Sequence, residues 1–424
     1  MSTLHVSGPA LLNGTVAVSG AKNSAIKLLA AALLTGERVE LENFPTELVD
    51  VREQARFIRE CGAGLALDPT RDTAVISAQR FSAAKLDRFD HAFRITYLLV
   101  AGQILREGRA RIPYPGGCKL GDRKHDLHLS VWERLGATVT EHEEYIEVVC
   151  PRFTGAEIDF PITTVGGTEN ALLCGVIAGG ETLVRNAYIT PEVRDLIAFL
   201  CAMGAEIEVK GRSFLRITGR DRLQGARYRV MPDRIEALTW MIGAAVCGGR
   251  VTVRNVPWND LEIPLIHLRE AGVRMERQGD EAIISPDNLD PDGIQPFDLA
   301  CGAHPGIHSD MQPFFVLLAL CAQGNSLIVD YRYPDRIAFM PELARMALEP
   351  GHLQWERGRI RVRGPVALRG AEVTCPELRG GMALILAACI ADGESTIEGI
   401  EQPLRGYNHL FDKLKKLNAG VECM

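Results

Sequence analysis

The sequence predicts an α/β protein of two domains, each built from three repeated βαβα units. A unit of roughly seventy residues recurs six times along the 424-residue chain. Each unit begins with a polar turn and an apolar helix, and a Gly and a β-branched strand follow. Each unit also has an apolar face that it cannot cover alone, so six units fit naturally as two groups of three.

The repeats can be followed along the chain. Their first halves occupy residues 19–45, 90–117, 163–192, 232–258, 308–336 and 376–407. A second helix follows in each unit, often ending in a "GA" turn before another strand, as in "ECGAGLAL" and "AMGAEIEV". We expect residues 21–230 to form one domain, and residues 1–20 with 231–424 to form the other, because the N-terminal strand should cross over to close the second group. The active site is expected in the cleft between them.

The composition bounds the class of protein. The chain is 46% hydrophobic and 24% charged, and its net charge of −7 argues against nucleic acid as the main partner. Its longest apolar runs are too short to cross a membrane, and no secretory signal is evident. The cysteines lack paired spacing, which indicates a reduced compartment. We therefore expect a cytoplasmic protein.

Cations recur where a helix should disfavour them. A cation at the partly positive N-terminus of a helix is unfavourable by about 0.3–1 kcal/mol. Four nevertheless stand at or near the start of a first helix: Lys22, Arg94, Arg234 and Arg379. If these helix starts face one cleft, they form a trap for a multiply charged anion, such as a molecule with both phosphate and carboxylate.

The fifth repeat departs from this pattern. Asp310 occupies its helix start, either as an ordinary N-terminal acid or, among so many cations, as a general base. Three further arginines lie in loops stiffened by Pro or Gly: Arg123, Arg336 and Arg405.

The stretch "YPGGCKLGDRKHDLHL", residues 114–129, places Cys118 behind two glycines and close to three cations. Nearby cations favour the thiolate, which is typical of a reactive cysteine. His125 and His128 are interpreted as polar loop residues. Cys301, His304 and His308 could suggest a metal, but without a second pair of ligands we expect neither a metal nor an organic cofactor.

The motifs "SGAKNSA", "PGGCKLGDR", "PDRIE", "SDMQ", "ELR" and "RGY" occur in the order seen in the enolpyruvyl transferases. The chain resembles this family over essentially its whole length, and most closely the members that act on UDP-N-acetylglucosamine. The resemblance implies a pair of three-repeat domains in an inside-out α/β barrel arrangement. It also implies transfer of the enolpyruvyl group of phosphoenolpyruvate to an acceptor hydroxyl, with release of phosphate.

The resemblance further implies residue roles. Lys22, Arg123 and Arg405 should hold the phosphate and Arg336 and Arg379 the carboxylate, with Arg94 supporting the closed state. Cys118 should protonate C3 of the donor or assist product release, and should be alkylated by fosfomycin. Asp310 should accept the acceptor's proton. Residues expected to bind the uridine nucleotide are Asn23, Arg123, Asp126, Leu127, Thr164, Val165, Gly166, Asp233, Asp310 and Arg332. The partners expected are therefore small molecules, and the family implies a monomer.

Departures from the family pattern cluster on the acceptor side. Ile162 stands where the family usually has a lysine, and Arg332 stands where a small apolar residue is common. Three functions therefore stay open. The acceptor is the 3-hydroxyl of UDP-N-acetylglucosamine in peptidoglycan precursor synthesis, or it is another uridine nucleotide, such as the 3'-hydroxyl of UMP in nucleoside-antibiotic biosynthesis. The third reading is a non-catalytic nucleotide-binding homologue.

Overall fold

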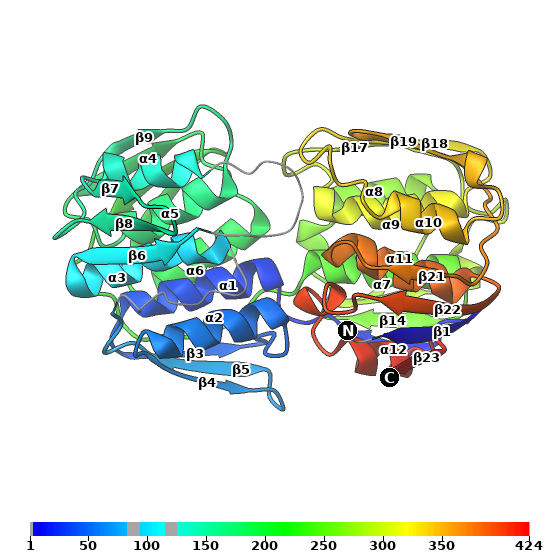
Figure 1. Ribbon diagram of the computed structural model, residues 1–424, viewed down its shortest axis with the longest axis horizontal. Helices are drawn as coiled ribbons and strands as arrows, with labels where there is room; N and C mark the ends of the chain where they lie inside the picture. Colours follow the sequence, from blue (N-terminus) through cyan, green and yellow to red (C-terminus); the bar gives the residue numbers. More distant parts are fainter. Residues whose placement is uncertain (1–2, 83–93, 115–124, 424) are drawn as a thin grey trace. The chain divides into compact units, whose positions relative to one another are not determined.

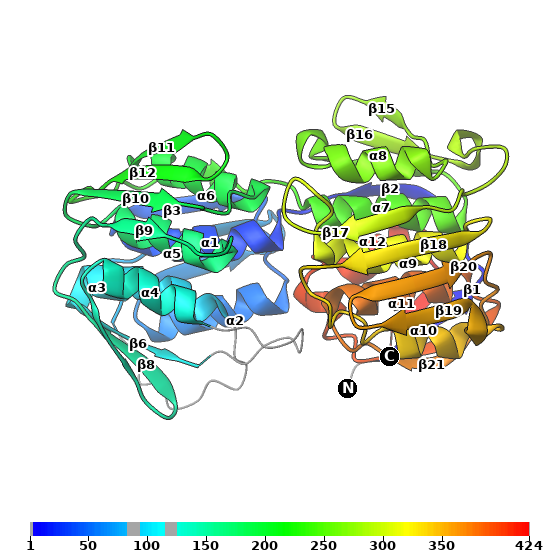
Figure 2. The same cartoon turned by 90° about the horizontal axis from the view of Figure 1, so that it is seen from above.

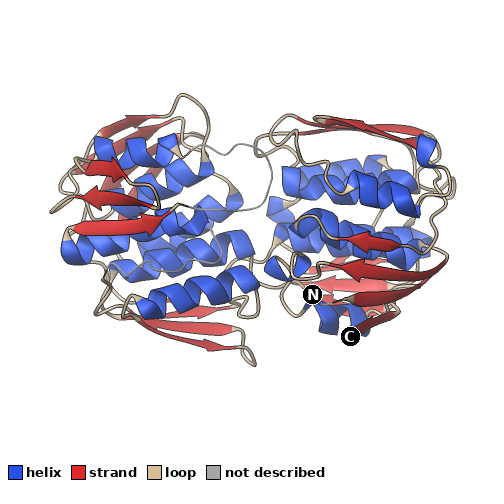
Figure 3. Cartoon of the chain, viewed as in Figure 1, coloured by secondary structure: helices blue, strands red, loops and turns tan. Residues whose placement is uncertain are grey.

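A computed structural model describes residues 3–82, 94–114 and 125–423. These residues divide into two compact units. Unit 1 contains residues 3–19 and 232–423, and unit 2 contains most of residues 20–231. Both units are mixed α/β structures, and Figure 3 shows strands on the outside of each unit and helices within it.

Unit 2 holds three sheets in the part of the chain that the structure describes. The first has the order β13 (Arg227–Arg229), β3 (Arg38–Glu42), β5 (Thr73–Ser77), β4 (Gly64–Asp68). The second has the order β6 (Arg109–Pro113), β8 (Tyr145–Val149), β7 (Thr138–Glu141). The third has the order β11 (Glu206–Lys210), β12 (Phe214–Thr218), β10 (Glu181–Arg185), β9 (Glu157–Asp159).

Unit 1 holds three further sheets (Figure 2). Their orders are β15 (Glu276–Gln278), β16 (Glu281–Ile284), β14 (Val251–Arg254), β2 (Gly14–Ala17); then β17 (Asp298–Cys301), β18 (Asn325–Asp330), β20 (Arg359–Arg363), β19 (Leu353–Glu356); then β21 (Glu372–Thr374), β22 (Gly393–Glu398), β1 (Leu4–Gly8), β23 (Val421–Cys423).

One pairing rule runs through the four-stranded sheets. In each, one parallel pair is followed by two antiparallel pairs, as in β9 with β10, β10 with β12 and β12 with β11. The N-terminal strands obey the same rule inside unit 1, because β2 pairs parallel with β14, and β1 pairs antiparallel with β22 and β23. The repeated βαβα units that the sequence predicts are therefore present.

Within the described ranges, six helices form the interior of the units. They are α1 (Lys22–Ala31), α3 (Val100–Glu107) and α5 (Val165–Gly175) in unit 2, and α7 (Arg234–Cys247), α9 (Gln312–Leu320) and α11 (Leu378–Ile390) in unit 1. Every residue of α9 is buried, as expected for a helix that is apolar on all sides. Helices α7, α9 and α11 pack against one another, and Figure 1 shows them between the sheets of unit 1.

The second helix of each repeat completes the layers. These helices are α2 (Val49–Glu60), α4 (Asp126–Arg134), α6 (Pro191–Ala202), α8 (Glu262–Glu270), α10 (Met340–Met346) and α12 (Leu410–Lys416). Short 3₁₀ helices are η1 (Ala32–Leu34), η2 (Arg94–Leu99), η3 (Trp258–Asp260), η4 (Pro286–Asn288), η5 (Ser309–Met311), η6 (Pro350–His352) and η7 (Pro403–Arg405). Among the described residues, no helix combines the length and apolar character that crossing a bilayer requires.

The "GA" turns explain how each second helix returns to a strand. The glycines of three such turns share a left-handed backbone, with φ of 93° at Gly62 and Gly136 and 92° at Gly204. Gly272, which is followed by Val273, has the same conformation with φ of 81°. Only glycine adopts this conformation at little cost, so the motif marks the helix end. The Gly that the sequence places after each first helix is the C-cap only of α3 (Gly108) and α7 (Gly248). The other first helices end before their Gly, with C-caps at Ala32, Val176, Cys321 and Ala391.

A buried ion pair joins two interior helices of unit 2. Lys27 Nζ of α1 lies 2.6 Å from Glu169 Oε1 of α5, and their side chains are 7% and 6% exposed. Burial raises the pKa of Glu169, and the charge of Lys27 only partly counters this shift. The charge of Lys27 therefore offsets only part of the cost of burying the carboxylate.

Removing Lys27 should destabilise the protein in a pH-dependent way. Lys27→Met leaves a buried carboxylate unpaired, which should cost about 3–5 kcal/mol at about pH 8. A carboxyl whose pKa is higher in the folded state than in the unfolded state takes up its proton more readily when folded. The destabilisation caused by its buried charge therefore disappears as pH falls through the folded-state pKa. Urea unfolding at about pH 8 and about pH 5 should show a smaller loss at the lower pH.

Two variants complete this test. Lys27→Met combined with Glu169→Leu should recover most of the stability, since no charge stays buried. Lys210→Met, at an exposed pair with Glu208, should change stability by less than about 1 kcal/mol. An equal loss for Lys27→Met at both pH values would contradict the account.

Candidate active site

A carboxylate held between two buried arginines is the central feature of unit 1. Asp310 lies in η5, just before α9. Its Oδ1 is 2.7 Å from Arg336 Nη2, and its Oδ2 is 3.5 Å from Arg379 Nε. The arginine side chains are only 3% and 2% exposed, whereas that of Asp310 is 18% exposed. Asp310 is thus the most accessible member of the group.

Two helix caps supply the remaining negative charge. Glu377 caps α11 by accepting from the amide of Arg379 at 3.0 Å, and its Oε2 is 3.5 Å from Arg336 Nη1. Asp233 caps α7 by accepting from the amides of Ile235 and Glu236 at 2.8 and 3.1 Å. The Asp233 carboxylate also lies 3.9 Å from Arg379 Nη2. Burial raises the pKa of Asp233, and the charge of Arg379 opposes that shift.

These caps explain how cations stand at helix starts. Arg234 is the first residue of α7 and Arg379 the second residue of α11, as the sequence predicts. Each helix is preceded by an acid whose side chain binds the first backbone amides, which offsets the partial positive charge there. The compensation is local, and the positions of the cations alone did not predict it.

Tyr407 fixes the orientation of Arg379 and was also missed. The Arg379 guanidinium lies 5.1 Å from the centre of the Tyr407 ring, within the range of a cation–π contact. The Tyr407 hydroxyl is 3.0 Å from Thr239 Oγ1. Burial raises the pKa of Tyr407, so the phenol stays neutral. Its place in the "RGY" motif was the available signal.

In unit 2, Lys22 begins α1 and its Nζ lies 2.7 Å from Asp50 Oδ2, in the first turn of α2. Both side chains are about nine-tenths buried, at 11% and 10% exposed. Here the helix has no side-chain cap, and the carboxylate partner comes from a neighbouring helix. Asn23 follows in the first turn of α1 and is half-buried.

The segments predicted to bind the nucleotide begin two packed helices of unit 2. Asp126 and Leu127 are the first residues of α4. Thr164 caps α5, where its Oγ1 accepts from the amide of Gly167 at 3.2 Å, and Val165 and Gly166 start that helix. Helices α4 and α5 pack against each other, so the two starts belong to neighbouring elements.

His128 is not a loop residue, contrary to the interpretation from the sequence. It lies on α4, is 7% exposed, and its Nδ1 is 2.6 Å from Asn170 Nδ2 of α5. Its ring stacks on Tyr97 with 4.5 Å between centres. His125 precedes α4, and its Nε2 lies 2.9 Å from Glu141 Oε2. The apolar spacing of "LHLSVW" was the signal for a helix here.

Other predicted residues lie elsewhere. Arg405 ends η7, where its Nη1 donates to Gln402 Oε1 at 3.2 Å. Arg332 follows β18, and its amide donates to Asp330 Oδ1 at 2.9 Å. The backbone of Arg94 begins η2. Cys118 and Arg123 lie outside the described residues.

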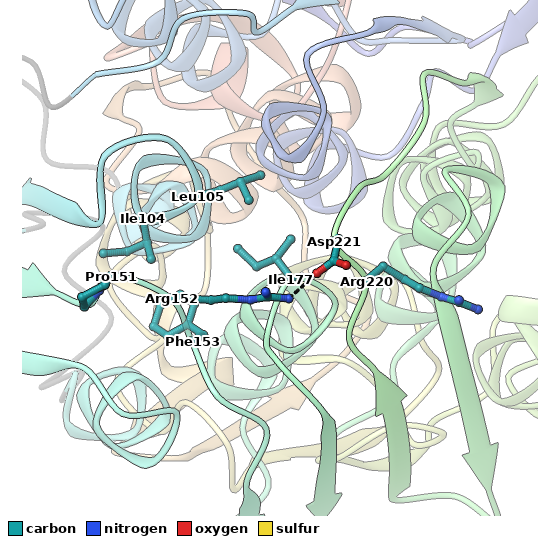
Figure 4. Close-up of a pocket in the computed structure, with 8 residues that line it drawn as sticks. All are labelled: Ile104, Leu105, Pro151, Arg152, Phe153, Ile177, Arg220 and Asp221. Carbon is teal, nitrogen blue, oxygen red and sulfur yellow. Dashed lines mark hydrogen bonds and ion pairs between the residues drawn. The ribbon is translucent and has the colours of Figure 1, made fainter.

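A pocket of about 310 Å³ lies in unit 2 (Figure 4). Its walls include Ile104, Phe153 and Ile177, and the Arg152–Asp221 ion pair of 2.5 Å lies among them. None of the predicted site residues lines it. In the described ranges, no cluster of three or more His, Cys, Asp or Glu side chains has the geometry of a metal site.

Comparison with solved structures shows the class of protein to which this fold belongs. The enolpyruvyl transferase NikO from Streptomyces tendae matches the whole chain with a TM-score of 0.88 and 26% identity, over 99% of its own length. An EPSP synthase from Acinetobacter baumannii matches with a TM-score of 0.73 at 17% identity, which supports the fold alone. The predicted fold class is therefore confirmed.

Sequence comparison gives the family. The family described as EPSP synthase (3-phosphoshikimate 1-carboxyvinyltransferase) matches residues 6–414. A UDP-N-acetylglucosamine 1-carboxyvinyltransferase of Acidobacterium capsulatum is 38% identical over 100% of this chain and 96% of its own. One from Koribacter versatilis is 36% identical over the same shares. The chain therefore belongs to the EPSP synthase family of enolpyruvyl (carboxyvinyl) transferases. This confirms the resemblance to the enolpyruvyl transferases and the prediction that the protein is an enzyme.

The cluster predicts that Arg379 cannot be replaced by lysine. Arg379→Lys keeps the positive charge but removes the planar guanidinium group. A lysine ammonium cannot contact both Asp310 and Asp233 while also lying over the ring of Tyr407. We expect a loss of about 2–4 kcal/mol in the free energy of unfolding, measured by urea unfolding. Arg345→Lys, at a pair with Glu342 whose arginine is 57% exposed, should change it by less than about 0.5 kcal/mol. Equal effects of the two substitutions would refute this view of the cluster.

Proposed function

We propose that this enzyme transfers the enolpyruvyl group of phosphoenolpyruvate to the 3-hydroxyl of UDP-N-acetylglucosamine, with release of phosphate. The observation that carries the proposal is Asp310 between Arg336 and Arg379, since this arrangement offers two cations for an anionic donor and one base for a hydroxyl. The names of the relatives at 35–38% identity support the choice of acceptor.

The donor's carboxylate would bind Arg336 and Arg379. Guanidinium groups match carboxylates in geometry, and burial strengthens their attraction. Lys22, Arg123 and Arg405 would hold the phosphate, with Arg94 in support. Lys22 already binds the carboxylate of Asp50, so an anionic ligand would compete with that contact.

Asp310 would act as the general base. Its two oxygens face the guanidinium groups of Arg336 and Arg379, which stabilise its charge and weaken it as a base. A donor carboxylate that binds these arginines would take over part of their attraction. Asp310 would then be more basic when the donor is bound, and could take the proton of the acceptor hydroxyl.

The reaction would proceed by addition and elimination. The acceptor oxygen bonds to C2 of the donor while a proton adds to C3, which gives a tetrahedral intermediate. Loss of a proton from C3 and of phosphate from C2 restores the double bond. We assign the C3 proton transfer, or assistance to product release, to Cys118. The chemistry calls for no metal or organic cofactor, because positioned cations stabilise the charges.

A second acceptor remains a candidate because of Ile162, which is 62% exposed where the family usually has a lysine. Without that cation the segment from Thr164 to Gly166 would grip a diphosphate less firmly, which favours a smaller uridine nucleotide such as UMP. Arg332 would lie at the sugar. Asn23, Asp126, Leu127, Asp233 and Arg123 would complete nucleotide binding. Since both substrates are cytoplasmic metabolites, we place the enzyme there, as a monomer that does not bind nucleic acid.

The test of the function is phosphate release from phosphoenolpyruvate with UDP-N-acetylglucosamine and UMP offered in parallel. We expect release with the sugar nucleotide. Ile162→Lys should lower the KM for UDP-N-acetylglucosamine more than any KM for UMP, because the added cation would meet the second phosphate. Release with UMP alone would establish the second acceptor, and no release with either would favour the non-catalytic reading.

Asp310→Asn tests the base. The amide keeps the shape of the side chain but cannot accept a proton, so turnover should fall by about 10²–10⁴-fold. Donor KM should change little by comparison, measured in the same phosphate assay. Asp335→Asn is the matched control, since Asp335 is an exposed partner of Arg357 close to Arg336 in sequence. Normal turnover by Asp310→Asn would remove the residue from this role.

A further inference from the structure

One imidazole, that of His128 on α4, contacts α5 close to the point where both helices begin. We propose that His128 is a positioning residue that sets the spacing between Asp126–Leu127 and Thr164–Gly166, and thereby the affinity for the uridine nucleotide. This inference rests on the proposed function, because it concerns the same nucleotide segments. It adds a residue that belongs neither to the cluster of Asp310, Arg336 and Arg379 nor, in our proposal, to the groups that contact the nucleotide itself.

The first contact that carries the inference joins the two helices. His128 lies two residues after Asp126 on α4, and Asn170 lies four residues after Gly166 on α5. The imidazole Nδ1 and the amide Nδ2 of Asn170 are 2.6 Å apart, and both residues are buried. A buried hydrogen bond of this kind fixes one helix start against the other, since breaking it would leave a polar atom without water.

The second contact explains the glycine in the "TVGG" turn. A Cβ placed on Gly166 would lie 2.5 Å from His128 Cε1 and 2.7 Å from Nε2. Real side chains do not approach so closely, so any other residue at 166 would force the ring or the turn to move. The edge of the imidazole therefore lies directly against the backbone of the predicted nucleotide segment.

The ring has little freedom to move away. Its face stacks on Tyr97, with 4.5 Å between centres and 26° between planes, and Tyr97 is fully buried. With its face held by Tyr97 and Nδ1 held by Asn170, the imidazole acts as a rigid spacer. This matters more in this chain because Ile162 supplies no cation to the segment, so the backbone and its placement must hold the nucleotide.

Substitution at both sides of the contact tests the proposal. The measured quantity is the Kd of UMP and of UDP-N-acetylglucosamine by calorimetry, together with the KM for phosphoenolpyruvate. His128→Ala should weaken nucleotide binding about tenfold and leave the KM for phosphoenolpyruvate within about twofold. His142→Ala is the matched control, because its imidazole also stacks on a tyrosine of unit 2, Tyr145, but belongs to neither segment.

The double variant separates positioning from a general loss of structure. Gly166→Ala should weaken nucleotide binding at least about tenfold in the wild type, but by less than about threefold when His128 is already Ala, because the clash is gone. Should His128→Ala fail to fold, as judged by circular dichroism, Asn170→Ala carries the same test, since it frees the ring and keeps the stacking on Tyr97.

Equal nucleotide affinity in wild type and His128→Ala would overturn the inference, and so would an equal cost of Gly166→Ala in both backgrounds. A parallel rise in the KM for phosphoenolpyruvate would indicate a purely structural role and would overturn it too. If the wild-type protein binds neither nucleotide, both this inference and the proposed function are overturned. If the wild type binds a nucleotide and His128→Ala binds it equally well, only this inference is overturned.

Discussion

Buried positive charge at the start of an interior helix is the constraint around which both units are organised. The helix end is already partly positive, and a cation placed there needs a carboxylate close by. In unit 1 the acids that cap α7 and α11, Asp233 and Glu377, provide it, and Asp310 joins them between Arg336 and Arg379. In unit 2 the same need is met by packing, because Asp50 reaches Lys22 from α2. The result is cations that stay dehydrated and oriented, yet have partners that an anion could displace.

The two units contain different chemistry. Unit 1 gathers arginines and carboxylates, whereas the predicted nucleotide segments of unit 2 are helix starts with few charges. In the proposed reaction Asp310, Arg336 and Arg379 of unit 1 act on the donor carboxylate and the hydroxyl, whereas the segment from Thr164 to Gly166 of unit 2 binds the nucleotide through its backbone. The exposed Ile162 fits this difference, since a neutral side chain stands two residues before Thr164. Acceptor choice would then depend on backbone placement more than on charge.

The repeat, the fold class and the cations at helix starts could be predicted from the sequence because they are periodic or local. Gly62, Gly136, Gly204 and Gly272 indicate a turn whose left-handed backbone only glycine adopts easily. The partners could not be predicted, because they come from distant parts of the chain: Glu169 for Lys27, Tyr407 for Arg379, and Asn170 for His128. His128 was misread because a histidine next to a Gly- and Lys-rich stretch has the composition of a loop. Its burial depends on Tyr97 and α5, which a local pattern does not contain.

The first strand of the chain lies between two strands from its last part. β1 pairs with β22 on one side and with β23 on the other, and Leu4 faces both Ile397 and Cys423. A ribosome makes a chain from its N-terminus, so residues 4–8 emerge well before residues 393–397 and 421–423, with which they pair. The described strands of unit 2 have been made by then, whereas the sheet that holds β1 must wait for β21, β22 and β23. Until then the backbone N–H and C=O groups at both edges of β1 lack these partners, and such unpaired edges can pair with the strands of other chains.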